Sequence, residues 1–140
     1  KERYDRVDDA VCAVRSALEE GILPGGGVAL FNIASDIIAY ADDNMEHISQ
    51  DQYIAMHIVG WSIQSPLLQI IDNAGKDGYE IMSSVDGSGH GYDVKNDCYG
   101  DMFGMGIIDP LKVTKNALKN AVSVATTILS TNAIVTLTRA

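Results

Sequence analysis

Apolar residues recur every three or four positions before Gly21, which is the spacing of one helix face. The pattern predicts an amphipathic helix that ends at Gly21, because glycine is the usual residue just past a helix end. A nearly continuous apolar stretch, 28–40, predicts a second helix that is buried inside the fold. The apolar stripe of the first helix consists of Val7, Ala10, Val11, Val14, Ala17 and Leu18.

Further helices are predicted from residues that favour helix starts and ends. Ser49 and Gln52 have the spacing of a capping box, in which two side chains pair with free amides at a helix start. Asp77 can cap a short helix, and Pro66 and Pro110 suit a first turn because proline lacks an amide hydrogen. The expected ranges are 50–64, 66–74, 78–84 and 111–130.

The sequence becomes rich in glycine over 86–106, where apolar and aromatic residues loosely alternate around Tyr92 and Tyr99. This texture predicts a small β-hairpin within a long loop. β-Branched residues dominate 133–138, which predicts a lone strand that pairs with something outside the chain. The expected fold class is therefore mostly α, with a small β-hairpin and a C-terminal strand.

Length and charge narrow the function classes. The 140 residues suffice for about one domain. Ten Lys and Arg against nineteen Asp and Glu give a net charge of -9, the wrong sign for binding nucleic acid or an anionic membrane. Cys12 and Cys98 form no metal motif or disulfide framework, and no uninterrupted apolar run spans a membrane, so we expect a soluble protein in a reducing compartment. Because the chain opens at Lys1 within a helical pattern, we expect it to be a piece of a longer protein.

Two features of the N-terminal part could carry chemistry. Asp9 lies about 200° around the first helix from Val7, so it faces away from the apolar stripe. It is either a solvated carboxylate or a functional one. Gly25, Gly26 and Gly27 precede the second helix, whose free amides could meet an anion or a nucleotide. A tight turn between two helices is the alternative interpretation of these glycines.

The C-terminal part offers two further candidates. Asp109 precedes Pro110, so it is either the N-cap of the last helix or a carboxylate that accepts hydrogen bonds from the hydroxyl pair of a sugar. Asp93, Val94 and Lys95 form either a hairpin turn or part of a site. The histidines share no ligand spacing with one another or with a cysteine, so we expect no zinc site.

Several short segments occur in an order that is typical of one protein family. The N-terminal segments are Arg6-Val7-Asp8-Asp9-Ala10, Glu19-Glu20-Gly21-Ile22 and Gly25-Gly26-Gly27-Val28-Ala29-Leu30. The C-terminal segments are Gly91-Tyr92-Asp93, Tyr99-Gly100, Gly106-Ile107-Ile108-Asp109-Pro110 and Lys112-Val113-Thr114. With these segments the chain resembles the group I chaperonins, the GroEL-type ATP-dependent folding machines, over nearly all of its length.

The resemblance implies that the chain is the C-terminal portion of such a chaperonin. Residues 1–20 would be the last helix of the intermediate domain, and residues 21–140 the C-terminal half of the equatorial, ATP-binding domain. ATP is the implied cofactor, together with Mg, whose ligands are expected in the first equatorial half, outside this chain. The lysine and the phosphate loop that hold the triphosphate are expected there too.

The resemblance also assigns site residues. Asp9 matches the catalytic aspartate that positions the attacking water. Gly26, supported by Gly25, matches the glycine that contacts the nucleotide through its backbone, and Asp109 matches the carboxylate that binds the ribose. The family usually has Asn-Ala-Ala beside the adenine, and the residues here are Asp93, Val94 and Lys95.

The implied function is ATP-dependent assistance of protein folding by a ring of like subunits. The implied partners are other chaperonin subunits, and unfolded proteins and a co-chaperonin bound through domains outside this chain. We expect the chain alone not to hydrolyse ATP, and we expect its parent in a bacterial cytoplasm or an organelle matrix. The alternative is a stand-alone acidic helical interaction module without ATPase activity.

Overall fold

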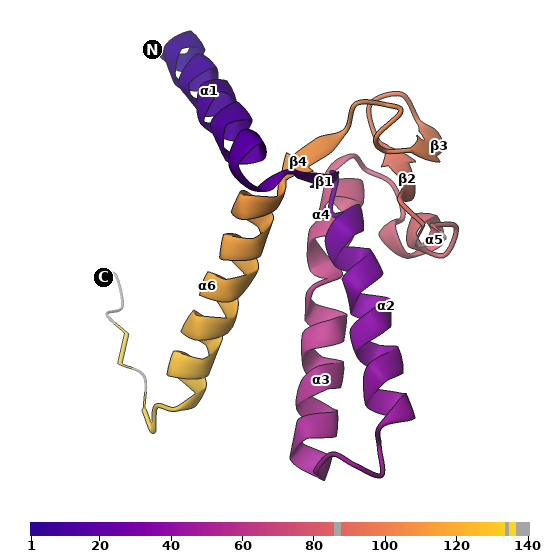
Figure 1. The fold of residues 1–140 in the computed structure, drawn as a ribbon, viewed down its shortest axis with the longest axis vertical. Coiled ribbons are helices and arrows are strands. Elements are labelled where there is room, and N and C mark those ends of the chain that lie inside the picture. The colour runs from indigo at the N-terminus through magenta and orange to yellow at the C-terminus, as the bar shows by residue number, and fades with distance from the viewer. Residues whose placement is uncertain (86–87, 134, 137–140) are drawn as a thin grey trace.

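The computed structural model describes residues 1–85, 88–133 and 135–136. Helices dominate these residues and short strands pair into small sheets, so the predicted mostly α fold class is confirmed (Figure 1). In chain order the elements are α1 (Glu2–Glu20), β1 (Ile22–Pro24), α2 (Val28–Asp43), α3 (Gln50–Ser62), α4 (Ser65–Asn73), α5 (Gly78–Met82), β2 (His90–Asp93), β3 (Cys98–Asp101), β4 (Ile108–Pro110) and α6 (Leu111–Leu129).

The helix boundaries follow the start and end signals of the sequence. α1 ends at Gly21, whose φ of 94° lies in the region that favours glycine. α3 opens with the predicted capping box: the Ser49 hydroxyl accepts a hydrogen bond from the Gln52 amide at 3.2 Å, and the Gln52 side chain accepts one from the Ser49 amide at 2.9 Å. Asp77 caps α5 by accepting hydrogen bonds from two amides of its first turn. Capping predictions of this kind need only local sequence.

The buried helix predicted over 28–40 is only partly correct. α2 runs on to Asp43, and along it only Val28 and three alanines are buried. Ile33 and Tyr40 are exposed, so the chain by itself does not bury this helix completely. α2 packs against α3 and α4, and these helices cover only part of its surface.

A two-stranded sheet that the sequence analysis missed joins the segment after α1 to the segment before α6. β1 and β4 are antiparallel, and Leu23 pairs with Asp109 while Pro24 pairs with Ile108. Each strand has three residues, and the two lie far apart in the sequence. Strands this short show no alternating pattern, so only the folded structure reveals the pairing.

The predicted hairpin is present as β2 and β3, in which Tyr92 pairs with Tyr99 and Asp93 with Cys98. The strand predicted over 133–138 has a different outcome. Residues 133, 135 and 136 have no strand structure. The remaining residues of that prediction, 134 and 137–138, lie outside the described residues.

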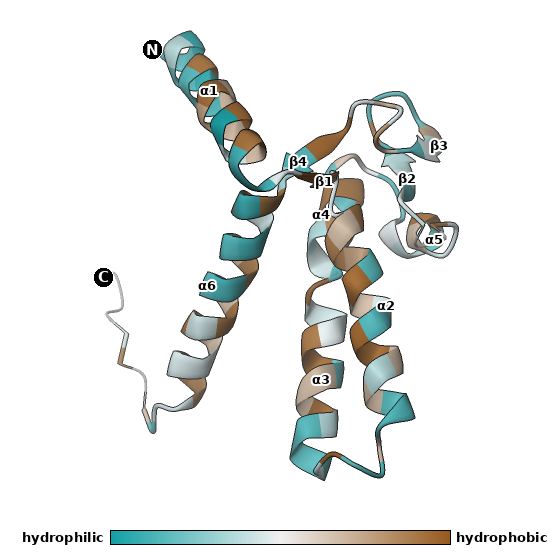
Figure 2. Ribbon diagram, in the orientation of Figure 1, coloured by the Kyte–Doolittle hydropathy of each residue, from teal (hydrophilic) through white to brown (hydrophobic). Residues whose placement is uncertain are grey.

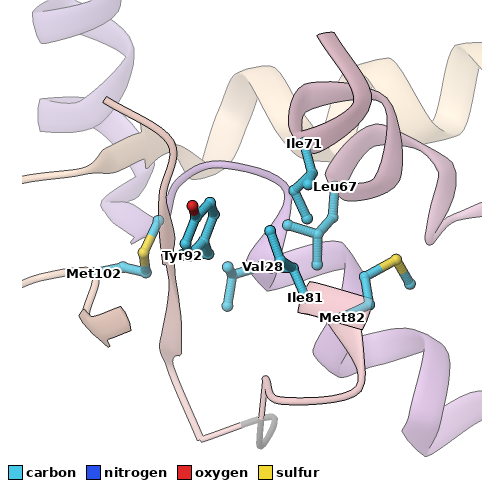
Figure 3. Packing of buried hydrophobic residues seen from close by; sticks show 7 residues of the cluster. All are labelled: Val28, Leu67, Ile71, Ile81, Met82, Tyr92 and Met102. Atoms are coloured by element: carbon cyan, nitrogen blue, oxygen red, sulfur yellow. The ribbon is translucent and has the colours of Figure 1, made fainter. Parts of the chain in front are cut away.

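The core lies between α4, α5, the hairpin and the first turn of α2 (Figure 3). Phe31, Leu68, Val94, Met105 and Ile107 pack around it with partial burial. Its buried members come from five separate segments, so the core ties the middle of the chain together. They are Val28, Leu67, Ile71, Ile81, Met82, Tyr92 and Met102.

The two end helices lie outside this core. No residue of α1 or α6 is buried, so the predicted apolar stripe of α1 faces solvent. Apolar residues are visible along both helices in Figure 2. The chain exposes 10168 Å², whereas a compact monomer of this mass exposes about 7,000 Å². The fold therefore presents far more surface than a self-contained domain of its size.

The α3–α4 stretch, Gln50–Asn73, is long and apolar enough to cross a membrane by length and composition alone. Core helices of soluble proteins pass the same test. Here α3 packs along α2, and two α4 residues, Leu67 and Ile71, belong to the core. The expectation that the chain does not enter a membrane stays a prediction.

Candidate functional site

Two of the sequence candidates meet at the start of α2. The β1–β4 ladder places Asp109 beside Leu23, directly before the turn formed by residues 25–27, which we call the glycine turn. The Gly25 amide extends the ladder by donating a hydrogen bond to the Ile107 carbonyl at 2.9 Å. Strand pairing therefore positions the Asp109 segment against the entry to the glycine turn.

Met102, the residue directly after the hairpin, connects the hairpin to the start of α2. Met102 is 1% exposed. A methyl group on Gly91 would lie 2.5 Å from Val28 Cγ2 and 2.7 Å from Met102 Sδ. A methyl group on Gly26 would lie 3.0 Å from Met102 Cε. The Met102 side chain thus packs between the hairpin and the glycine turn, as the packing role expected of a methionine suggests.

Glycine occurs at the three positions of the turn for two different physical reasons. A methyl group on Gly25 would lie 3.0 Å from the Ile107 carbonyl, and one on Gly27 would lie 2.7 Å from the Leu67 amide nitrogen. Close backbone packing explains both residues, which confirms the tight-turn interpretation for them. Gly26 has a φ of 64°, and the nearest neighbours of a methyl group there would be the flexible end of Met102 at 3.0 Å and a methyl carbon of Ile107 at 4.0 Å. α2 begins without a side-chain cap, and its first amide, that of Val28, donates a hydrogen bond to the Gly25 carbonyl at 3.2 Å.

Asp109 is not the N-cap of the last helix, because α6 begins after Pro110 and has no side-chain cap. The residue lies in β4, where its backbone pairs with Leu23 and its conformation is that of a strand. Burial raises the pKa of the Asp109 carboxyl above its usual value, and no hydrogen bond from the described residues offsets that desolvation. A half-buried carboxylate with open acceptor positions is suited to receive the hydroxyl groups of a ligand.

We expect the substitution Asp109→Asn to stabilise the chain at neutral pH. The raised pKa means that the folded chain favours the protonated form of Asp109. Ionised Asp109 therefore lowers the free energy of unfolding. This loss is absent below the pKa of the unfolded chain, about 3.9, and develops as pH rises through the higher pKa of the folded chain. Urea denaturation at pH 3.5 and pH 7 measures the effect. The variant should gain stability only at pH 7, and a loss at pH 7 would reveal a partner that holds the carboxylate.

Asp93 shapes the hairpin turn. It is 8% exposed, and its carboxylate accepts hydrogen bonds from the Lys95 amide at 2.9 Å, the Asn96 amide at 3.3 Å and the Asn96 side chain at 2.6 Å. The side-chain bond from Asn96 is the largest reason that the pKa of Asp93 is lowered. Val94 packs on the core and Lys95 is exposed. The hairpin-turn interpretation is confirmed, and it leaves mainly backbone atoms and the Lys95 side chain for any ligand.

Asp9 lies apart from the other candidates. It is exposed on α1, eleven residues before the helix end, a distance of about 16 Å along the helix axis. Figure 1 shows α1 projecting from the β1–β4 sheet away from α2. The end of α1 is held to the start of α6 by two ion pairs, Glu19 with Lys112 and Glu20 with Lys115. The structure therefore does not bring Asp9 to the glycine turn.

The sequence analysis missed a polar network at the tip of the hairpin. The Lys76 ammonium lies 2.8 Å from the Asp97 carboxylate, which also accepts a hydrogen bond from the Tyr92 hydroxyl. Lys76 and Asp97 are both surface residues without motif context, so no sequence signal connects them. Among the described residues no three His, Cys, Asp or Glu side chains form a metal-binding group, so we assign no magnesium ligand to this part of the chain.

Comparison with known proteins identifies the family. The model of the TCP-1/cpn60 chaperonin family matches residues 1–139. The chain belongs to this family. Over 137 residues the chaperonin chain is 44% identical to Chaperonin GroEL 3 of Psychromonas ingrahamii (strain DSM 17664 / CCUG 51855 / 37), a match that covers 96% of this chain and 24% of that protein. The chain thus spans about a quarter of the length of that curated relative, and the predicted resemblance to GroEL-type chaperonins is confirmed.

Proposed function

We propose that this chain is the C-terminal part of a chaperonin that binds and hydrolyses ATP and uses the cycle to assist protein folding. Residues 1–20 then belong to the intermediate domain and residues 21–140 to the equatorial domain. The main support is the meeting of the glycine turn with Asp109, a half-buried carboxylate that lacks a donor in the described chain. The two exposed free thiols, Cys12 and Cys98, suit the reducing cytoplasm or organelle matrix that we propose.

The large exposed surface supports the proposal that the chain is one part of a larger equatorial domain. The excess over a compact monomer, about 3,000 Å², is the size of an obligate interface. Much of it lies on α1 and α6, which have no buried residue. The first equatorial half of the same polypeptide would cover part of this surface, and neighbouring subunits of a ring would cover the rest.

In the proposed site the ribose lies against Asp109, whose carboxylate accepts hydrogen bonds from the two hydroxyl groups. These donors would compensate the desolvation that raises the pKa of the carboxyl. The backbone of Gly25 and Gly26 lies along the nucleotide, since the absence of a side chain at Gly26 permits close approach. The hairpin turn contributes backbone contacts to the adenine side, because the Asp93 carboxylate is already bonded within the turn.

Asp9 acts in this proposal after a rotation of α1. We place the hinge of this rotation at Gly21. Its φ of 94° and ψ of -170° are accessible to glycine, and no atom lies within 4 Å of the position that a side chain would take. The rotation requires the Glu19–Lys112 and Glu20–Lys115 ion pairs to separate. Asp9 would then orient a water molecule toward the terminal phosphate, while groups outside this chain neutralise the triphosphate with magnesium.

A chimera tests the proposal. In it this chain replaces the matched 137-residue stretch of Chaperonin GroEL 3, so that the remaining three quarters of a chaperonin are present. We expect the chimera to bind and hydrolyse ATP, and we expect the isolated chain to show no turnover because it lacks the phosphate-binding groups. Steady-state ATPase rates measure both. A folded chimera that binds no nucleotide would contradict the proposal and favour the stand-alone interaction module.

A further inference from the structure

A polar network ties the tip of the β2–β3 hairpin to the end of α4. We propose that Lys76, Asp97 and Tyr92 are positioning residues that hold the hairpin against the base of the bound nucleotide, and so set base selectivity. The inference rests on the proposed ATP site and concerns the residues that control its base selectivity.

The network has a charged pair at its centre. Lys76 Nζ lies 2.8 Å from Asp97 Oδ2, and the Tyr92 hydroxyl donates a hydrogen bond to Asp97 Oδ1. The bond from Lys76 is the largest reason that the pKa of Asp97 is lowered, and the bond to Asp97 likewise raises the pKa of Lys76. Both groups therefore stay charged around neutral pH, and both oxygens of the carboxylate are bonded.

The position of Lys76 is set by the end of α4. The Gly75 amide donates a hydrogen bond to the Asp72 carbonyl at 2.9 Å, and the Lys76 amide donates one to the Ile71 carbonyl at 3.3 Å. With Gly75 at a φ of 75°, these bonds form a Schellman motif, which ends the helix in one defined direction. Lys76 therefore extends from a rigid helix end.

The same helix also contacts the glycine turn. The Leu67 backbone lies so close to Gly27 that a methyl group there would be 2.7 Å from the Leu67 amide nitrogen. Leu67 and Ile71 share the core with Tyr92, as Figure 3 shows. α4 thus holds the glycine turn near its first residues and the hairpin tip just past its last. Loss of the Lys76 contact would loosen the tip of the hairpin around Asp97, while core packing holds its strands and the glycine turn in place.

The network of Lys76, Asp97 and Tyr92 has a different role from that of Asp93. Asp93 forms its hydrogen bonds inside the turn and so shapes the loop itself. Asp97, whose φ is 56°, joins that loop to Lys76 on another element. Changing the network should therefore move an intact turn relative to the rest of the site. A movement of this kind alters contacts to the base more than contacts to the ribose or phosphates.

The experiment compares ATP and GTP turnover by the GroEL 3 chimera with and without Lys76→Met. We expect KM for ATP to rise about fivefold, which corresponds to one exposed charged contact, with kcat nearly unchanged. The preference for ATP over GTP should fall by a similar factor. Asp97→Asn should have the same effect, because asparagine tolerates the positive φ of that position. Tyr92→Phe keeps the buried ring and removes only the hydroxyl, so it reports on the network even if the other variants fold poorly.

Two controls separate positioning from general stability. Lys76→Arg keeps the ion pair and should retain the selectivity of the parent chimera. Arg6→Met removes an exposed pair with Glu2 on α1 and should leave the ATP:GTP ratio unchanged. If Lys76→Met lowers the melting temperature but leaves that ratio unchanged, the inference is wrong although the ATP site stands. A parent chimera that binds no nucleotide contradicts the proposed function first.

Discussion

Replacing Asp9 by alanine in the GroEL 3 chimera is expected to slow ATP turnover by roughly two orders of magnitude while ATP affinity hardly changes. Asp9 lies on a helix that projects away from the glycine turn, so it makes no ground-state contact that the variant could lose. Its proposed role begins only when α1 rotates and a water molecule must be oriented. Single-turnover rates and equilibrium nucleotide binding separate the two effects.

Asp109→Ala is the matched comparison, since it also removes one carboxylate. For Asp109→Ala we expect weaker ATP binding, because the ribose loses its hydrogen-bond acceptor. The effect on the rate at which bound ATP is hydrolysed should be smaller. Asp9→Ala should therefore change mainly the turnover rate, whereas Asp109→Ala should change mainly the affinity for ATP. If Asp9→Ala loses affinity and keeps its turnover rate, Asp9 is a binding residue and its assignment as the catalytic carboxylate is wrong.

Gly27→Ala is expected to destabilise the chain by about 3 kcal/mol, the largest stability effect that we expect from one added methyl group. Gly27 has a φ of 83°, which strains any residue with a side chain. The new methyl group would also lie 2.7 Å from the Leu67 nitrogen and 2.8 Å from its Cα, both backbone atoms of α4. Backbone atoms cannot rotate away, so α2 and α4 must separate at the centre of the core. Urea denaturation followed by circular dichroism measures the change.

Gly75→Ala is the control for the backbone term alone. Gly75 has a similar φ, 75°, but no atom lies within 4 Å of the position that a methyl group would take. We expect a loss of about 1 kcal/mol there, from conformation without steric overlap. Equal losses at the two positions would show that Leu67 moves aside freely, and the close packing of the glycine turn on α4 would then carry little energy.

Local residue choice determined the helices of this protein. The capping box at Ser49 and Gln52, the Asp77 cap and the glycine after α1 act within a few residues, so their outcome can be read from the sequence. Family membership was also readable, because the order of short segments survives even where the segment 93–95 has changed. The roles proposed for Asp9, Gly26 and Asp109 came from that resemblance and stay predictions.

Only the tertiary structure decided how these parts meet. The β1–β4 pairing places Asp109 in a strand opposite Leu23, which removes the helix cap from the two interpretations of this residue. The Lys76–Asp97 pair joins two loops that no periodicity connects. The apolar stripe of α1 and part of the apolar surface of α2 stay exposed, since an apolar stripe shows that a face is to be covered but not which element covers it. Sequence thus determined the helices and the hairpin, whereas long-range pairing and packing, which depend on residues far apart in the chain, decided the β1–β4 sheet and the site.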